Sequence, residues 1–366
     1  MAKNSVMNKG YAIDIIMAGI RSCTGSCVYC AAANNSDVIF RNQFIDEVNC
    51  KTVKEFKIDF RKLENTLINH PNIRRDKLNI VIWGGDPLSA FTPFKMTVAF
   101  LEMLRKKYNL KFSIMSSTNG MPLGNKELID FCIKHDIIIQ LSHDAVAECL
   151  RLPIDPLIEF RDNIARLPRV KVNCVAHYYN CDFKKIIEYF DKYRTPNMSI
   201  RISKPMLGAN YSKTINRFGF RNGEYFEELK GKPFGDFGIR NTKEEPHLVD
   251  DYVNAMFNLP KGYVNSGMKK PSFSDKVNGC GIYSTGARDW SSHIDTLGNY
   301  TFCNLIDSMG KVANKECNFQ FKECENCKYK TSSLCKGCCI NPPEGTIHEK
   351  CELLYKINET YELRIS

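Results

Sequence analysis

The sequence lacks the features that would place this protein at a membrane or on a nucleic acid. No apolar run approaches the length of about 20 residues that a membrane-spanning helix needs. The first residues, MAKNSVMNKGYAID, hold no long apolar stretch and no small-residue cleavage site, so no secretion signal is visible. There is no arginine-rich run, and a formal charge of +10 over 366 residues is modest. We therefore expect a cytosolic protein with a solvated basic surface and no membrane or nucleic-acid partner.

Internal repeats and low-complexity tracts are also absent, and the composition is that of a globular protein, with 43% hydrophobic and 11% aromatic residues. The length predicts one large domain and a smaller one. The sequence contains 17 cysteines, three of them in residues 23–30 and nine in residues 280–351. In a cytosolic protein such clusters favour metal binding over disulfides. The remaining five are predicted to be small buried hydrophobic residues: Cys50, Cys132, Cys149, Cys174 and Cys181.

Strands and helices are predicted to alternate over the first 200 residues. Apolar runs predict six strands, at 11–18, 78–83, 111–118, 137–142, 170–177 and 198–203. Helical spacing predicts helices between them, at 51–70, 92–107, 125–135, 155–167 and 182–193. This alternation is typical of parallel βαβ units in an α/β fold. Residues 207–279 have weak periodicity, so we predict domains at 1–206 and 280–366 joined by an irregular segment.

The loop after the first predicted strand carries the motif Cys23-Thr-Gly-Ser-Cys27-Val-Tyr-Cys30. Three closely spaced thiolates can hold three irons of a [4Fe–4S] cluster and leave the fourth iron open for a small ligand. A four-ligand zinc site is harder to complete, because the next cysteine is Cys50. The alternatives are a structural metal loop and a chance spacing among the 17 cysteines.

The spacing C-x3-C-x2-C, with an aromatic residue before the last cysteine, resembles the signature of radical S-adenosylmethionine (SAM) enzymes. The resemblance implies that SAM binds the open iron and is cleaved to a 5′-deoxyadenosyl radical. It also implies a partial (β/α)6 TIM-like barrel, with the chemistry at the carboxyl ends of the strands. The cysteine loop, Gly84-Gly85-Asp86-Pro87 and the Ser-Thr-Asn-Gly at 117–120 all follow predicted strands, which agrees with this arrangement.

Several further residues resemble SAM-binding positions of the family. Gly84-Gly85-Asp86-Pro87 is similar to the family's Gly-Gly-Glu motif, which holds the SAM ammonium group, although Asp replaces Glu here. Tyr29 corresponds to a side chain that packs near the adenine. The ends of the third and fourth strands offer polar partners for the ribose or carboxylate of SAM: Ser117, Asn119, Ser142 and Asp144. An ordinary turn at Gly84–Pro87 and helix capping at the other positions are the alternatives.

The cysteine-rich C-terminal region resembles the seven-cysteine SPASM domain, which holds two auxiliary [4Fe–4S] clusters in peptide-modifying radical SAM enzymes. The resemblance implies a first cluster on Cys280, Cys303 and Cys339, and a second on Cys324, Cys327, Cys335 and Cys351. One family cysteine is missing after Cys280, so the first cluster would keep an open iron or take Asp289, His293 or Asp295 as a ligand.

The remaining cysteines of this region leave its metal content open. Cys338 is a possible substitute for Cys335 or Cys339, and Cys317 is unassigned. A twitch domain with one auxiliary cluster is an alternative. A structural zinc ribbon on residues 324, 327, 335 and 338 is another.

The resemblance implies an enzyme that abstracts hydrogen from a peptide substrate. Anaerobic sulfatase-maturating enzymes use an Asp after the Gly-x4-Cys element as a base, but Asn304 stands there, and Asp307 is the nearest candidate. Crosslinking or epimerisation of a ribosomal peptide is therefore favoured over formylglycine formation. The expected reductant is a flavodoxin or ferredoxin. Because no room precedes Cys23 for a winged helix, leader recognition is expected from a separate protein or from residues 207–279. A radical SAM enzyme on a small molecule or nucleotide, an iron–sulfur electron carrier and a zinc scaffold are the alternatives.

Overall fold

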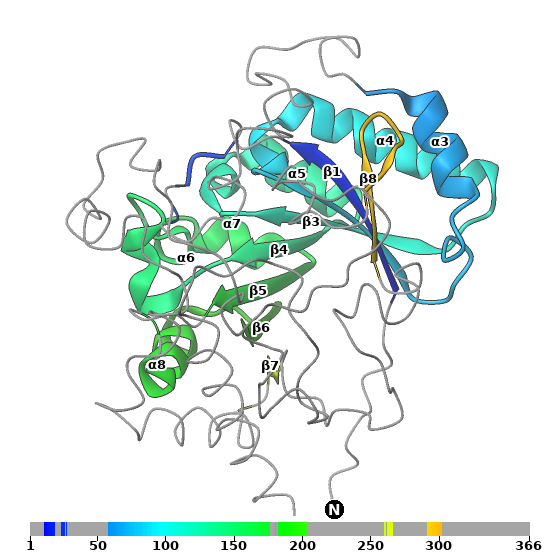
Figure 1. Cartoon of the computed structure of the whole chain (residues 1–366). Helices are drawn as coiled ribbons and strands as arrows, with labels where there is room; N and C mark the ends of the chain where they lie inside the picture. Colours follow the sequence, from blue (N-terminus) through cyan, green and yellow to red (C-terminus); the bar gives the residue numbers. More distant parts are fainter. Residues whose placement is uncertain are drawn as a thin grey trace, which may run out of the picture.

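The computed structural model of the chain describes residues 11–18, 23–25, 27, 58–175, 180, 182–203, 260, 262–265 and 291–301. These residues build one large sheet flanked by helices (Figure 1). The sheet order is β7-β6-β5-β4-β3-β2-β1-β8-β9, and every neighbouring pair is parallel except β8 and β9. The predicted parallel α/β sheet is therefore confirmed, and β7 and β9 stand at its two open edges.

The strands match the expected ranges closely. They are β1 Tyr11–Ala18, β2 Leu78–Gly84, β3 Phe112–Thr118, β4 Ile138–Ser142, β5 Arg169–Val175, β6 Met198–Ser203, β7 Tyr263–Asn265, β8 Ser291–Asp295 and β9 Tyr300–Thr301. From β1 to β6, strands that follow one another in the sequence are also neighbours in the sheet. All their carboxyl ends therefore lie along one edge, where loops from successive strands meet.

The helices lie between these strands in the sequence. They are α3 Phe60–Ile68, α4 Phe91–Lys107, α5 Lys126–Lys134, α6 Pro156–Glu159, α7 Arg161–Arg166 and α8 Phe183–Tyr193, with short 3-10 helices η2 Pro87–Ser89, η3 Met121–Gly124 and η4 Ala145–Leu150. Asp59, Asn125 and Asp182 cap three of them by accepting backbone N–H bonds. Of the predicted helix 51–70, residues 51–57 lie outside the described part.

Two helix boundaries differ from expectation. The predicted helix over 155–167 is two helices, because Phe160 has φ −114° and ψ 24° and ends α6 one residue before α7 begins. Its ring lies 2.9 Å from the point where a Cβ on Gly124 would be, so the break lets the ring pack against η3. Helix α4 begins at Phe91, one residue before the predicted start, and its N-cap is Ala90, which makes no side-chain cap bond, in place of the predicted Thr92, because the chain turns directly from η2 into α4.

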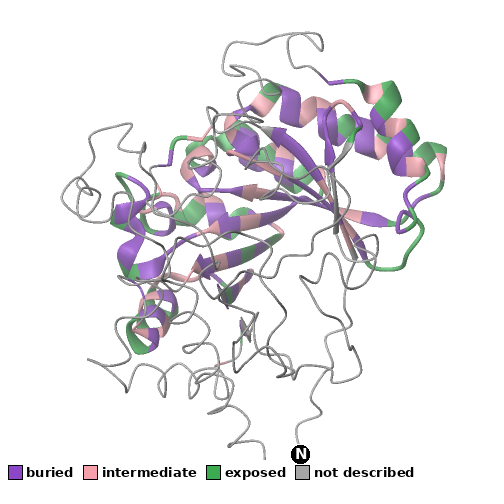
Figure 2. Ribbon diagram, viewed as in Figure 1, coloured by how far each residue is buried: buried purple, intermediate pink, exposed green. Residues whose placement is uncertain are grey.

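One main hydrophobic core lies between the sheet and its helices. Alternate residues of each strand point into it, such as Ile13 and Ile15 of β1, and pack against fully buried helix residues such as Phe94 and Leu101. Figure 2 shows these buried stripes along the strands and helices. The opposite side of the sheet, which we call the inner face, holds a smaller apolar cluster composed of Ala12, Val81, Trp83, Met115 and Ile138. The helices therefore cover the outer face.

Residues 291–301 join this sheet, although the sequence placed them in the C-terminal region. Strand β8 pairs in parallel with β1, and the turn from β8 to β9 packs on α3. Thr66 Oγ donates to the carbonyl of Gly298 at 2.7 Å, and the Asp59 N–H donates to that of Thr296 at 2.9 Å. The Asp295 carboxylate accepts bonds from the N–H groups of residues 297 and 299 and from the Asn299 side chain.

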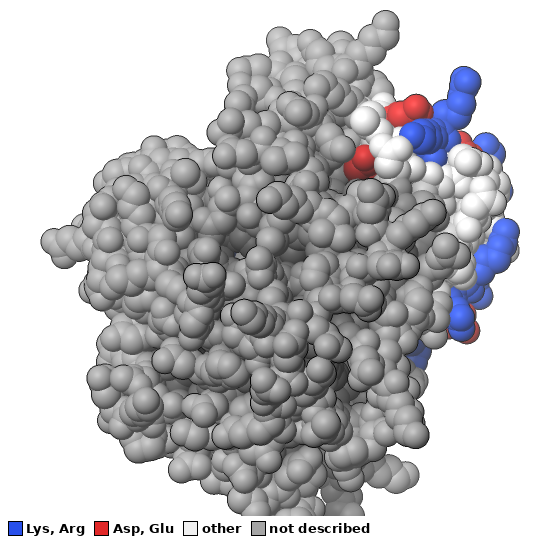
Figure 3. Space-filling view, in the orientation of Figure 1, with Lys and Arg blue, Asp and Glu red and all other residues white. Residues whose placement is uncertain are grey.

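Basic and acidic side chains occur together on the described surface over α3 and α4 (Figure 3). Lys107 and Glu64 form an ion pair there at 2.8 Å. At least part of the positive charge on this surface is therefore balanced locally, as expected for an ordinary solvated surface. Among the described helices none is both long and apolar enough to cross a bilayer.

Candidate functional site

The cysteine loop lies at the carboxyl edge of the sheet, directly after β1. A Cβ placed on Gly25 would lie 3.4 Å from Cys23 Sγ and 3.6 Å from Cys27 Sγ, so both sulfur atoms face the same small space. The Gly25 N–H also points at Cys23 Sγ, at 3.4 Å. A glycine at this position leaves that space open between the two thiols.

The end of β2 supplies a tight turn through Gly84, whose φ of 140° is readily adopted only by glycine. Asp86 follows it, and its side chain is fully buried. One carboxylate oxygen accepts the Leu88 N–H at 3.1 Å and so caps η2. The other accepts from Thr118 Oγ at 3.0 Å and from the Asn119 N–H at 2.9 Å. Asp86 thus ties the turn after β2 to the end of β3.

Burial raises the pKa of Asp86 to about 6, against the opposing effect of these hydrogen bonds. Sequence reasoning expected this carboxylate to face the SAM ammonium group. In the structure both of its oxygens accept hydrogen bonds from the protein itself. Of the same motif, Gly85 is half-buried and Pro87 is buried as the first residue of η2.

Asn119 connects the end of β3 to the cysteine loop. Its Nδ2 lies 3.5 Å from Cys23 Sγ and donates to Thr24 Oγ at 3.2 Å, while its Oδ1 accepts the Met121 N–H at 2.9 Å. The next residue, Gly120, has φ 97°, and a Cβ there would lie 2.8 Å from Leu141 and Pro156. Asn119 therefore lies beside the cysteine loop, and Gly120 permits the turn that brings it there; its contact with SAM stays a prediction.

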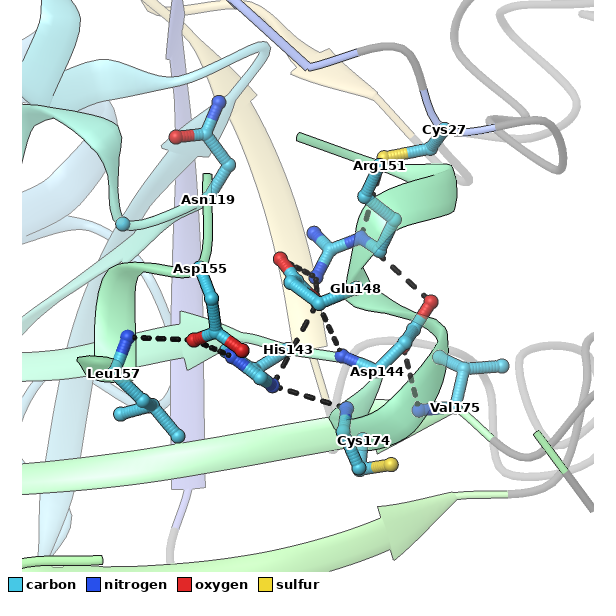
Figure 4. Close-up of polar contacts among 12 residues, drawn as sticks. Cys27, Asn119, His143, Asp144, Glu148, Arg151, Asp155, Leu157, Cys174 and Val175 are labelled. Atoms are coloured by element: carbon cyan, nitrogen blue, oxygen red, sulfur yellow. Dashed lines mark hydrogen bonds and ion pairs between the residues drawn. The ribbon is translucent and has the colours of Figure 1, made fainter. Parts of the chain in front are cut away.

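Arg151 lies on the other side of the loop and was missed by sequence reasoning. It is 3% exposed, and its Nε lies 3.4 Å from Cys27 Sγ (Figure 4). Its Nη1 donates to both carboxylate oxygens of Glu148, at 3.2 and 3.1 Å, and its Nε lies 3.7 Å from Asp144 Oδ2. Burial raises the pKa of the Cys27 thiol, and the neighbouring guanidinium opposes that rise.

Two buried carboxylates hold this arginine in place. Glu148 accepts the Asp144 N–H at 2.6 Å, and Asp144 Oδ1 accepts the Val175 N–H at the end of β5, at 3.2 Å. Burial raises the pKa of Glu148, and the Arg151 charge opposes that rise. A guanidinium held by two carboxylates has a defined position, because buried charges must be paired. The expected polar residue Asp144 is therefore present at the edge, bound to protein groups.

A second chain of polar contacts supports the same segment from behind. His143 Nδ1 accepts the Ala145 N–H at 3.0 Å, so Nε2 carries the proton and donates it to Asp155 Oδ1 at 3.0 Å. Tyr189 of α8 donates a short hydrogen bond to the other oxygen of Asp155. Burial would raise the pKa of Asp155, but the bonds from His143 and Tyr189 outweigh it and lower this pKa. This series of hydrogen bonds anchors the loop after β4 to α8.

The remaining predicted residues divide into two groups. Ser117 and Ser142 are half-buried and alternate along their strands with residues of the outer core, so they lie on the inner face near the edge. The others lie outside the described residues: Tyr29, Cys30, Cys280, Cys303, Asp307, Cys324, Cys327, Cys335, Cys339 and Cys351. The same holds for Asp289, Asn304, Cys317 and Cys338.

Neither a family model nor a curated relative matches the sequence. The structure is similar to that of anSMEcpe, an anaerobic sulfatase-maturating enzyme, with bound AdoMet (SAM), at a TM-score of 0.53 and 16% identity over 96% of this chain and 97% of that one. It is also similar to anSMEcpe with AdoMet and a Cp18Cys peptide, at a TM-score of 0.51 and 15% identity over 97% of this chain and 98% of the other. This chain has the fold of anSMEcpe. The predicted partial barrel is thereby confirmed.

The residues at the edge are chemically suited to an iron–sulfur cluster. Two thiols face one space, and amide and guanidinium donors lie beside their sulfur atoms, as is common around cluster ligands. Within the described part of the chain no three metal-ligating side chains come together, because Cys30 lies outside it.

Proposed function

We propose that this chain is a radical SAM enzyme that modifies a peptide. The observation that carries the proposal is the convergence of Cys23 and Cys27 on one space at the carboxyl edge of a parallel sheet. The fold supports it, because anSMEcpe shares that fold and was solved with AdoMet. A peptide substrate is supported by the structure of anSMEcpe with the Cp18Cys peptide.

Cys23, Cys27 and Cys30 would hold a [4Fe–4S] cluster with one open iron. When bound, this cluster and SAM supply one-electron cleavage of a sulfonium and a carbon radical that removes hydrogen from the substrate. Asn119 and Arg151 direct N–H groups toward two of the ligand sulfurs and thereby orient the loop. Hydrogen bonds to ligand sulfurs also influence the reduction potential of such a cluster.

Different residues around the cysteine loop would bind different groups of SAM. The Arg151 guanidinium, whose Nη1 donates to both carboxylate oxygens of Glu148, would bind the SAM carboxylate. The backbone carbonyls of Gly84 and Gly85 would accept the ammonium group. Asp86 then acts indirectly, because its hydrogen bonds shape the turn that presents these carbonyls.

Hydroxyl and amide groups from neighbouring strands complete the proposed SAM site. Ser117, Asn119 and Ser142 stand near the ends of β3 and β4 and would bond the ribose. Asp144 contributes by holding Arg151 and the end of β5. Tyr29 would pack near the adenine.

The modification proposed is a crosslink (thioether, ether or carbon–carbon) or an epimerisation in a ribosomal peptide. Asn304 replaces the base expected for formylglycine formation, and Asp307 is the nearest substitute. Auxiliary clusters on the C-terminal cysteines would accept or relay the surplus electron, with a flavodoxin or ferredoxin as the external reductant.

The test is reductive cleavage of SAM by anaerobically reconstituted protein. Wild type should form 5′-deoxyadenosine with a strong reductant, and the Cys23→Ala, Cys27→Ala and Cys30→Ala variants should form none. Cys149→Ala is the matched control: Cys149 was predicted to be buried, but it is exposed in the nearby η4 and should not affect cleavage. Wild-type protein that carries zinc in place of iron at the loop, or that leaves SAM intact, would refute the proposal.

A further inference from the structure

The inner face of the sheet changes character between β4 and β5. On β1 to β4 it holds the small apolar cluster around Val81, Met115 and Ile138, together with polar positions such as Asp14. From the end of β4 to β6 most alternating positions are polar or cationic, and their strand neighbours point into the outer core: Gln140, Ser142, Lys171, Asn173, Ser199 and Arg201. The inner face of the described β3 to β6 strands carries no acidic side chain.

Lys171 and Arg201 are cations for which the described residues provide no partner on this face. Within the described part of the chain neither forms a hydrogen bond or an ion pair, whereas Arg169, one inner-face position earlier on β5, pairs with Asp136 at 3.2 Å. Lys171 is opposite Ser199 and Arg201 is opposite Asn173, so the two cations are diagonal neighbours on adjacent strands. Both residues are exposed, but partial desolvation, followed by the charges of Arg169 and Arg201, lowers the pKa of Lys171, and partial desolvation lowers that of Arg201.

The pair lies on the side of the sheet and near the edge where the proposed reaction would occur. Arg201 of β6 pairs with Asn173 of β5, which in turn pairs with Ser142, the last residue of β4. Lys171 of β5 pairs with Gln140 of β4, which in turn pairs with Ser117 of β3. Two like charges held close together repel each other, and a bound anion would relieve that repulsion. The amides and hydroxyls around them can donate further hydrogen bonds to the same anion.

We propose that Lys171 and Arg201 form a carboxylate-binding site for the peptide substrate on the inner face of the sheet. The ligand is an Asp or Glu side chain or the C-terminal carboxylate of the peptide, bound through charge-assisted hydrogen bonds. Asn173 and Gln140 lie beside the two cations and are suited to bond the same group. This inference rests on the proposed function, because that function provides the peptide. It specifies the substrate class: a peptide with a carboxylate at a fixed distance from the modified residue.

The experiment selects binding peptides from a random library, so the natural substrate need not be identified first. Immobilised, anaerobically loaded protein with SAM is screened against displayed random short peptides, once with free and once with amidated C-termini. Asp or Glu should be enriched about tenfold at one position on wild type. Enrichment that disappears only on amidation identifies the C-terminal carboxylate as the ligand.

Variants connect the selection to the two cations. Lys171→Gln with Arg201→Gln should abolish the acidic enrichment, and Lys171→Glu with Arg201→Glu should select Lys or Arg instead. Arg169→Gln is the matched control and should behave as wild type, because Arg169 is already paired. If a double variant does not load its cluster, the single variants should each reduce the enrichment. An acidic preference that is absent in wild type, or unchanged in the double variant, would overturn the inference.

Cleavage of SAM without peptide separates the two proposals. Protein that cleaves SAM but shows no acidic preference retains the proposed function and loses the carboxylate site. Protein that binds acidic peptides through Lys171 and Arg201 but never cleaves SAM retains the site and loses the function.

Discussion

The outer face of the sheet and its carboxyl edge are equally buried but chemically opposite. Ile80, Phe94 and Leu101 in the outer core are fully enclosed by apolar atoms. At the edge Asp86, His143 and Arg151 are just as deeply buried, yet each is surrounded by hydrogen-bonding partners. Apolar burial stabilises the fold, whereas buried polar groups cost free energy unless they are paired.

This difference indicates that the carboxyl edge of the sheet is the candidate functional site. Apolar residues could have filled the edge at lower cost, because replacing a buried ion network by well-packed hydrophobic residues is often neutral or stabilising. Perturbed titratable groups gathered at one edge are typical of functional sites. Substitutions in the core should therefore change stability, and substitutions at the edge should change ligand binding or pH dependence.

The largest effect is expected from Leu101→Ala in α4. Leu101 is fully buried, so this substitution should lower the free energy of unfolding by about 2–5 kcal/mol through lost burial and a cavity. Met103→Ala on the same helix is the control, because Met103 is 40% exposed and should change stability by less than about 0.5 kcal/mol. Urea denaturation measures both. If both variants lost the same free energy of unfolding, the proposed difference between core and surface positions would be wrong.

Asp86→Asn should change the pH dependence of stability. The folded-state pKa of Asp86 is raised to about 6 from 3.8, so the protonated form is favoured in the folded state. The contribution of this group is fully present below about pH 4 and is lost as the pH rises through about 6. Relative to Asp86→Asn, wild type should therefore lose up to about 3 kcal/mol between about pH 4 and pH 7. Thermal denaturation at each pH measures the stability of both proteins. A stability difference between wild type and Asp86→Asn that does not change with pH would contradict this expectation.

Arg151→Lys should weaken SAM binding while the cluster still loads. Lysine keeps the charge but loses the planar fork that contacts Glu148 and faces Cys27, so the dissociation constant for SAM should rise about tenfold. Anaerobic equilibrium dialysis measures it, beside iron and sulfide content. Arg166→Lys, in an exposed pair with Asp130, should bind SAM as wild type does. Unchanged affinity in Arg151→Lys would remove Arg151 from the SAM site.

The smallest effect is expected from Tyr189→Phe. It deletes the hydroxyl that donates to Asp155, which keeps the bonds from His143 and from the Leu157 N–H. Stability should fall by about 1 kcal/mol, as for one net hydrogen bond. Tyr193→Phe, on the same helix, is the control and should change stability by less than about 0.5 kcal/mol. If Tyr189→Phe lost SAM cleavage, the hydrogen bond from Tyr189 to Asp155 would be needed for the geometry of the site, and the expectation of a small effect on stability alone would be wrong.

Most of the sheet could be predicted from sequence, because six strands are long apolar runs separated by helical spacing. Strands β7, β8 and β9 could not, since they are two to five residues long. Strand β8 pairs with β1, which is about 280 residues away, and no local pattern encodes such a contact. The break at Phe160 depends on packing against Gly124, a tertiary contact that periodicity does not contain.

The position of a candidate site residue was predictable where a motif follows a strand, as for Cys23, Cys27 and Asn119, whose roles remain predictions. Arg151 was missed because η4 is a 3-10 helix without apolar periodicity, so nothing in the sequence indicates that its side chain is buried. The only indication in the sequence is that Arg151 follows two acidic residues, Asp144 and Glu148, at short spacing. For Asp86 the position was predictable but its hydrogen-bond partners were not, since Thr118 and Asn119 approach it from another strand.

The most direct test is electron–nuclear double resonance of the reduced protein with SAM isotopically labelled in its carboxylate and amino groups. We expect hyperfine coupling between the labelled atoms and the cluster in wild type and in Cys149→Ala, and none in Cys27→Ala. A reduced, fully loaded wild-type protein without such coupling would contradict the proposal that the thiols at this edge hold a cluster with one iron open to SAM.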